Sequence, residues 1–270
     1  MAATVFEAIS NELALVHGRI AGELRLKAGN VPDLIPFDFC LHEQCLLPSL
    51  VILSARFSGD INNRVISMAA AMELAYLAQQ IHNRIGEEDQ PAAEPPGSGP
   101  QLPVLVGDYI FGKFLLYVCE AGCLEFLPVL ADIVCQMNEG GVIRKDVLES
   151  GQGSTLTTLR VIKKETALLF AESCRIGATI GGASADFVAT LREFGLQLGM
   201  AVGCHQFRQE PGLVENYLGH AKEELRQLPS GRDRDLLEKL AVQILITAQP
   251  QARCVPPAKR VTGNLAVAHF

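Results

Sequence analysis

Apolar residues recur at steps of three and four along most of the chain, and this spacing limits the folds open to it more than any other feature. Near the start, the spaced positions are Phe6, Ile9, Leu13, Val16, Ile20 and Leu24. Such spacing puts the side chains on one stripe of a helix, so the first 28 residues are predicted to form an amphipathic helix. Sustained alternation of apolar and polar residues, which a half-buried strand would show, is hard to find. The chain is therefore predicted to be all-α.

The same spacing predicts further helices along the chain. They span 41–57, 61–87, 102–119, 121–138, 155–180, 184–206, 212–228 and 231–248. Glycines between such segments, including the pair Gly140 and Gly141, are predicted to end helices. A single domain of about ten helices, residues 1–249, is predicted to form a bundle around a central cavity, because several helices must be surrounded by others.

Two segments interrupt the helical pattern. The stretch 86–103 is rich in proline, glycine and small polar residues, so it is predicted to be a mobile surface loop. Residues 250–270 contain three prolines and are predicted to form a C-terminal tail.

The charge and cysteine content exclude several classes of function. The formal net charge is −7 and the isoelectric point is near 5.4, so no nucleic-acid partner is expected. The N-terminus lacks a signal-peptide pattern, and no uncharged apolar run approaches the roughly 20 residues of a membrane helix, so no membrane span is expected. Eight cysteines without a CxxC pair fit reduced thiols. The protein is predicted to be cytoplasmic.

Four segments resemble helices of the polyprenyl diphosphate synthases, enzymes that elongate allylic diphosphates with isopentenyl diphosphate. Residues 105–111 (LVGDYIF) resemble the family's "LAGDYLL" helix, and 70–82 look like its "AAALELIH" helix. Residues 166–178 look like "KTAALF…LGA", and 194–201 are similar to the start of "YGxxLGxAFQ". The segments occur in the family's order, within roughly 40–245. The resemblance implies the all-α isoprenoid synthase fold.

The family's chemistry depends on magnesium, according to the same resemblance. The departing diphosphate is stabilised by about three Mg²⁺ ions, which as hard cations favour carboxylate and water oxygens. Two DDxxD motifs on facing helices supply these oxygens, since residues one helical turn apart share a face.

In this chain most of the motif aspartates are replaced. The residues at the motif positions are Asn83, Arg84, Glu87, Gln206, Phe207 and Glu210. Six aspartates thus become two glutamates, and each unit charge at about 4 Å is worth roughly 4 kcal/mol at an effective dielectric near 20. We therefore expect that magnesium binding is lost and that no cofactor is bound.

The positions that would bind diphosphate are changed as well. The family's "GKRLRP" falls at 43–48, where the proline is kept and no cation remains. The lysine of "KT" falls at Glu165, although Lys164 is adjacent. Arg84, Arg208 and Lys164 could together hold a diphosphate without metal, because guanidinium groups fork onto phosphate oxygens. The alternative is that these side chains are solvated at helix ends.

Two other pairs have a functional and a structural interpretation. His82 and His205 could form a mixed metal site with the two remaining glutamates, or they are core histidines. Cys119 and Cys123, four apart on a predicted helix, resemble the CxxxC pattern of the family's non-catalytic plant small subunits. They equally fit a buried pair of small apolar residues.

Taken together, these substitutions predict a non-catalytic or regulatory subunit of a heteromeric prenyl diphosphate synthase. Its partner would be a catalytically competent synthase subunit, or a second copy in a homodimer. The resemblance implies pairing through middle helices that include 102–119. The apolar face there comprises Leu102, Leu105, Tyr109, Phe114 and Tyr117. The alternatives are a divergent prenyltransferase with an altered metal site and a binder of an isoprenoid ligand.

Overall fold

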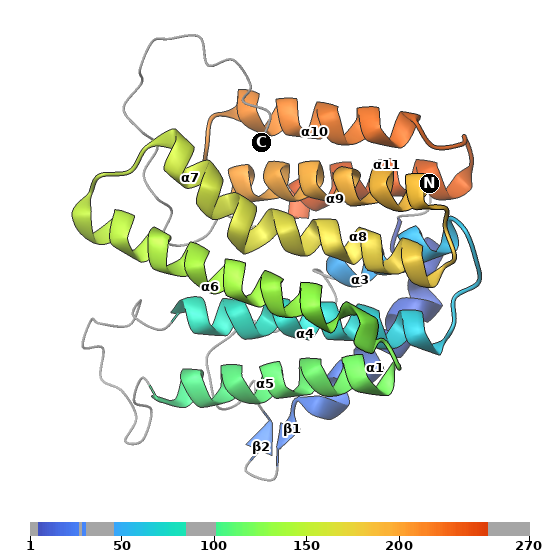
Figure 1. Cartoon of the computed structure of the whole chain (residues 1–270), viewed down its shortest axis with the longest axis horizontal. Helices are drawn as coiled ribbons and strands as arrows, with labels where there is room; N and C mark the ends of the chain where they lie inside the picture. Colours follow the sequence, from blue (N-terminus) through green and yellow to red (C-terminus); the bar gives the residue numbers. More distant parts are fainter. Residues whose placement is uncertain (1–4, 27–28, 31–45, 85–100, 248–270) are drawn as a thin grey trace.

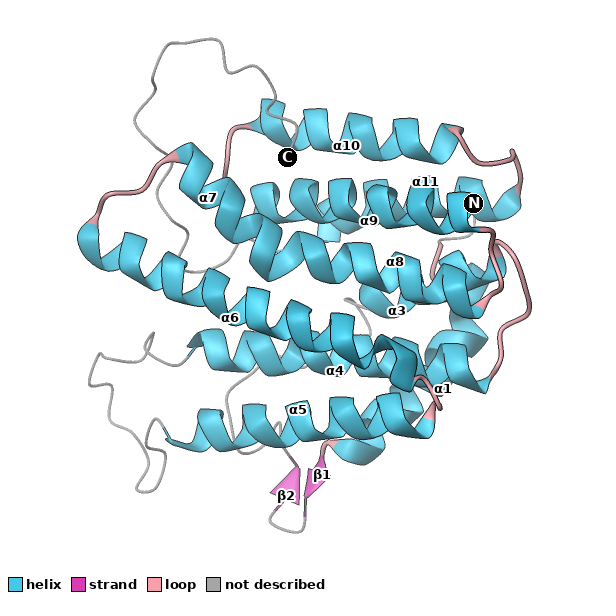
Figure 2. Cartoon of the chain, in the orientation of Figure 1, coloured by secondary structure: helices cyan, strands magenta, loops and turns pink. Residues whose placement is uncertain are grey.

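The protein is described here by a computed structural model, in which residues 5–26, 29–30, 46–84 and 101–247 are placed. Figure 2 shows that helices make up nearly all of this part. The all-α prediction is confirmed, with one small addition: β1 (Arg25–Leu26) and β2 (Gly29–Asn30) form an antiparallel pair, Arg25 opposite Asn30. The predicted tail 250–270 and residues 86–100 of the predicted loop lie outside the described residues.

The helices follow the predicted order along the chain. They are α1 (Ser10–Glu23), α3 (Leu46–Arg56), α4 (Asn63–Arg84), α5 (Gln101–Glu120), α6 (Leu127–Ser150), α7 (Thr155–Ile162), α8 (Leu168–Ile180), α9 (Ala185–Gln206), α10 (Pro211–Arg226) and α11 (Arg232–Thr247). Short 3-10 turns, Glu7–Ile9 and Leu124–Phe126, precede α1 and α6. A π-helical turn, Lys163–Ala167, joins α7 to α8.

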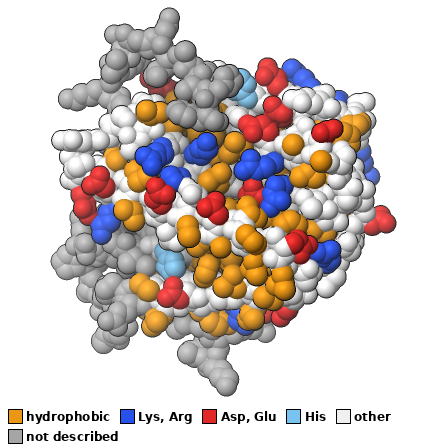
Figure 3. Space-filling model, in the orientation of Figure 1, with side chains coloured by type: hydrophobic (Ala, Val, Ile, Leu, Met, Phe, Trp, Pro, Cys, Tyr) orange, Lys and Arg blue, Asp and Glu red, His pale blue; other side chains and the backbone are white. Residues whose placement is uncertain are grey.

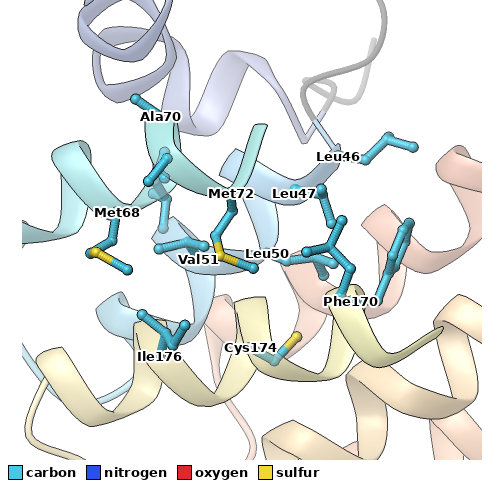
Figure 4. Packing of buried hydrophobic residues seen from close by; sticks show 14 of the residues in the cluster. Leu46, Leu47, Leu50, Val51, Met68, Ala70, Met72, Phe170, Cys174 and Ile176 are labelled. Carbon is cyan, nitrogen blue, oxygen red and sulfur yellow. The ribbon is translucent and has the colours of Figure 1, made fainter. Parts of the chain in front are cut away.

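Helix α3 lies at the centre of the bundle. It packs against α1, α4, α8 and α11, and every residue from Leu46 to Ala55 is buried. Figure 4 shows Leu50 and Val51 of α3 between Met72 of α4 and Cys174 of α8. The remaining helices lie roughly side by side in Figure 1, with α9 between α8 and α10, and α4 between α5 and α3.

Three predicted boundaries were wrong. The first helix ends at Glu23 instead of continuing to residue 28, because Arg25 and Leu26 enter the short β pair. Helix α5 includes 101–103, so the predicted loop 86–103 extends too far, and the predicted helix 102–119 starts one residue late. Helix α6 continues through Gly140 and Gly141, which had been expected to end a helix. Gly140 serves close packing there, because a Cβ on it would lie 2.8 Å from Cγ of Glu165.

Two helical segments are long and apolar enough, by length and composition alone, to cross a membrane: Leu102–Glu120 and Leu124–Ser150. Both carry charged side chains, which is why the sequence alone indicated no span. Lys113 of α5 binds Glu23 of α1 at 2.6 Å, so part of this helix's polar surface is used within the bundle. About a third or less of each segment is buried within the chain.

Candidate functional site

The first set of motif positions lies at the end of α4. Glu87 and the side chain of Arg84 are outside the described part of the structure. Asn83 is half-buried and faces α6, because a Cβ placed on Gly141 would lie 3.8 Å from the amide oxygen of Asn83. A neutral amide therefore occupies the α4–α6 junction where the resemblance implies an aspartate.

His82 turns toward α5. Its Nε2 lies 3.3 Å from Oδ1 of Asp108, and the ring packs directly over Gly107. Across the described ranges, no group of three His, Cys, Asp or Glu side chains could hold a metal ion. The mixed site of His82, His205 and the two glutamates needs Glu87, which is not described, so that site stays a prediction.

The second set begins with two buried residues at the end of α9. Gln206 is 7% exposed, and its side chain hydrogen-bonds the hydroxyl of Tyr76 on α4. Phe207 has no exposed surface. The buried residues that share its hydrophobic cluster are Val147, Val161, Ile162, Ala167, Met200 and Cys204. At the two positions that the resemblance assigns to an aspartate pair, this chain therefore has an amide that contacts another helix and a core aromatic ring.

The remaining residues of the second set lie on the surface. Arg208 is exposed and has a φ of 51°, which lets the chain turn from α9 toward α10. Glu210 is exposed and directly precedes the first residue of α10. This position fits the alternative interpretation, in which Arg208 is solvated at a helix end, and the diphosphate role of Arg208 stays a prediction.

A buried acid that sequence reasoning did not single out lies beside Gln206 and Tyr76. Glu73 of α4 is 5% exposed, and its Oε2 has no hydrogen-bond partner among the described residues. Burial raises the pKa of Glu73 to about 8, so the side chain is largely a neutral carboxylic acid at pH 7. Burial also raises the pKa of Tyr76, against the effect of the Gln206 hydrogen bond. The sequence offered one signal for this buried acid, since Glu73 is an acidic residue within the apolar run 65–78.

Lys164 and Glu165 point in different directions from the π-helical turn. Nζ of Lys164 binds Oε2 of Glu139 on α6 at 2.9 Å and also contacts Gln136. Glu165 is 3% exposed, and its Oε1 accepts a hydrogen bond of 3.1 Å from Nε of Arg144 on α6. Burial raises the pKa of Glu165, and Arg144 opposes that rise. Lys164, which the sequence indicated as a candidate diphosphate ligand, therefore binds side chains of α6.

Gly140 permits the close approach of α6 to this turn. A Cβ there would lie 2.8 Å from Cγ of Glu165 and 3.0 Å from Cβ of Lys164. We expect Gly140→Ala to lower the free energy of unfolding by about 1–3 kcal/mol, since packed segments must move apart. Gly18→Ala on α1 is the matched control, because a Cβ there meets open space and alanine favours helix by up to about 1 kcal/mol. Urea denaturation of both variants tests this; equal effects would contradict it.

The cysteine pair is separated by the end of α5. Cys119 is exposed on the last turn of that helix, whereas Cys123 is buried beyond it. Burial raises the pKa of the Cys123 thiol. The interpretation as a pair of buried residues on one helix was therefore wrong for Cys119, because α5 ends at Glu120.

A pocket of about 300 Å³ lies between α4, α5 and α6. Its lining residues are Ala75, Ala78, Gln79, His82, Asp108, Phe111, Val134, Met137 and Asn138. The amide oxygen of Gln79 is buried and has no hydrogen-bond partner among the described residues. The pocket thus combines a mostly apolar wall with a few polar groups, the usual composition of a small-molecule site.

The outward faces of α5 and α6 expose large hydrophobic side chains. Leu105 is 65% exposed, Leu116 52% and, on α6, Val142 70%. Figure 3 shows hydrophobic side chains gathered over the region of α5 and α6, below a group of Lys and Arg side chains over α7 and α8. Monomeric proteins rarely expose large contiguous apolar patches, so this face indicates a contact surface.

Comparison with solved structures defines the class of fold. The chain is similar to a polyprenyl synthase from Caulobacter crescentus CB15, complexed with calcium and isoprenyl diphosphate, with a TM-score of 0.76 at 20% identity, covering 89% of this chain and 96% of the other. It is similar to a decaprenyl diphosphate synthase from Rhodobacter capsulatus with a TM-score of 0.74 at 20% identity, covering 91% and 98%. The architecture is the isoprenoid synthase fold, as the sequence predicted.

Residues 45–203, more than half of the chain, match the family model described as polyprenyl synthetase, so the chain belongs to the polyprenyl synthetase family. It is 27% identical over 203 residues to "Heptaprenyl diphosphate synthase component 2" of Geobacillus stearothermophilus, covering 73% of this chain and 63% of that one. It is 29% identical over 166 residues to "Short chain isoprenyl diphosphate synthase" of Methanothermobacter thermautotrophicus, covering 58% and 51%. The chain spans about half to two thirds of these curated relatives.

Proposed function

We propose that this protein is a non-catalytic subunit that pairs with a catalytically competent prenyl diphosphate synthase and alters its activity or product length. The observation that carries the proposal is the burial of Gln206 and Phe207. Residues at these two positions would have to direct oxygen ligands at a metal cluster. In this chain the amide of Gln206 hydrogen-bonds Tyr76, and the side chain of Phe207 is a phenyl ring in the core.

Among the residues that the structure describes, the donor set does not fit a cluster of magnesium ions. Mg²⁺ requires oxygen ligands in near-octahedral geometry and usually binds through carboxylates and water. Asn83 and Gln206 offer neutral amides, and Phe207 offers no donor. The carboxyl of Glu73 is largely neutral at pH 7 because of its burial. These features support a chain that binds no magnesium diphosphate by itself.

The case for a partner rests on the outer face of α5 and α6 and on the relatives. Two matched proteins, from Geobacillus stearothermophilus and Bacillus subtilis, are named as component 2 of heptaprenyl diphosphate synthase. This naming supports an assembly of more than one component. Leu105, Leu116 and Val142 supply apolar area that another subunit could cover.

Two assays test the proposal. The purified chain, incubated with an allylic diphosphate, isopentenyl diphosphate and Mg²⁺, is expected to give no elongated product. Co-expressed with an intact synthase, the chain is expected to co-purify with it and to change the distribution of product lengths. Appreciable elongation by the chain alone would refute its non-catalytic role, and absence of co-purification would refute its role as a subunit.

The pocket between α4, α5 and α6 favours a second candidate function, the binding of an isoprenoid without reaction. Its volume of about 300 Å³ is at the lower end of the range for small-molecule sites. The lining is largely apolar, with Phe111, Val134 and Met137 as its larger hydrophobic residues. Equilibrium dialysis with a C15 prenyl alcohol distinguishes the candidates, because saturable binding by the isolated chain is required only by the second.

A further inference from the structure

A contribution to stability does not explain why Arg144 and Glu165 form a buried ion pair. Both residues are at least nine-tenths buried, with Nε of Arg144 3.1 Å from Oε1 of Glu165. Oε2 of Glu165 has no hydrogen-bond partner among the described residues. A buried ion pair seldom stabilises a protein more than apolar residues of similar size, and an unsatisfied buried oxygen adds a cost.

Three observations show where the carboxylate of Glu165 lies. The π-helical turn Lys163–Ala167 directs Glu165 inward while Lys164 contacts Glu139 on the surface. Gly140 leaves room for the side chain of Glu165 against α6. A Cβ on Gly141 would lie 3.5 Å from Oε1 of Glu165 and 3.8 Å from the amide oxygen of Asn83. The carboxylate therefore lies beside the end of α4, next to the first set of motif positions.

Arg144 and Glu165 together resemble an anion-binding site that a carboxylate of the chain already occupies. A guanidinium group is the side chain best suited to fork onto a phosphate or carboxylate, and a buried one needs an anion. In this chain Arg144 already has its anion in Glu165, and the second nearby cation, Lys164, has Glu139. Arg144 and Lys164, both among the described residues, are thus paired with carboxylates of the same chain.

We propose that Glu165 is an internal anion that occupies Arg144 and thereby excludes phosphate-type anions from the junction of α4, α6 and the π-helical turn. This inference rests on the proposed function and deepens it, since it supplies a cause of inactivity separate from the lost metal ligands. The excluded ligand class is a diphosphate or inorganic pyrophosphate. Its charge would be repelled by the Glu165 carboxylate, and the buried guanidinium of Arg144 is already paired.

The test is titration of the full chain with inorganic pyrophosphate, without metal, by calorimetry. The wild-type chain is expected to show no saturable binding up to millimolar concentration. Glu165→Gln keeps the size of the side chain, removes its charge and frees Arg144, so we expect binding at least tenfold tighter. Glu165→Met, of similar volume, is the second variant and should show the same gain. Circular dichroism confirms that each variant is folded.

Glu139→Gln is the matched control. It removes a carboxylate from a cation of the same junction, but that carboxylate is half-exposed, so no gain is expected. Adding Arg144→Ala to Glu165→Gln should abolish the gain. The proposal is overturned if the wild-type chain binds pyrophosphate as tightly as the variants, or if both folded variants bind none. These outcomes are independent of co-purification with a synthase, so failure of the proposed function would be seen separately.

Discussion

The double substitution Leu105→Asp and Leu116→Asp is expected to abolish association with a competent synthase. Both side chains lie on the outer face of α5, where Leu105 is 65% and Leu116 52% exposed in the single chain. Covering a leucine side chain contributes about 1.5–3 kcal/mol, and an unpaired carboxylate in a closed interface adds a further cost. Since each 1.4 kcal/mol is tenfold in affinity, we expect a loss of about a hundredfold or more.

Affinity capture of a co-expressed, tagged synthase measures this loss. Leu156→Asp on α7 is the control, because Leu156 is 61% exposed and helix α7 lies away from α5 in Figure 1. The isolated double variant should keep its thermal unfolding temperature, since neither leucine is buried in the bundle. Undiminished capture of the double variant would show that the partner does not bind this face of α5.

The second large effect concerns the pH dependence of stability through Glu73. The carboxyl has a pKa of about 8 in the folded protein, against an ordinary value of 4.5 that applies to the unfolded chain. Between these values the folded state holds a proton that the unfolded state has released. The free energy of unfolding therefore falls as pH rises, by about 1.4 kcal/mol per pH unit. The stabilisation is complete below about pH 4.5 and is lost as pH rises through 8.

Glu73→Gln removes this dependence, because glutamine imitates the protonated acid at every pH. The difference in unfolding free energy between variant and wild type should grow by about 3–4 kcal/mol from pH 5 to pH 8. Guanidinium denaturation at several pH values measures it. Glu165, whose pKa is also raised, is present in both proteins and cancels in the comparison. Parallel pH profiles would contradict the burial of an unpaired acid at this position.

The helical order was predictable because one apolar stripe per helix is a local property of the sequence. The same rule failed at Gly140 and Gly141, where the pattern cannot distinguish a glycine that ends a helix from one that admits a neighbouring segment. Only the contact with Glu165, 25 residues after Gly140 in the sequence, resolves this case. Whether a glycine ends a helix or permits close packing can be decided only when the residues that pack against it are known.

The candidate site was predictable to a lesser extent. Alignment to a known motif identified the replaced residues, but it could not show that Phe207 joins the core or that Gln206 contacts Tyr76. Glu73 was missed because its ionisation state depends on what packs around α4, which the sequence does not reveal. The resemblance left Lys164 and Glu165 as alternatives for one position, and the π-helical turn gives the two side chains different partners.

The burial of Phe207 also sets what a carboxylate at this position would cost. Substituting aspartate there would place a charge where the phenyl ring has no exposed surface. Such a substitution would lose the packing of a large aromatic side chain, about 3–5 kcal/mol, and would bury an ion in addition. Small proteins have only about 5–15 kcal/mol of net stability. An aspartate at position 207 would therefore need compensating changes in the surrounding residues, so a single substitution would not suffice to install a metal ligand there.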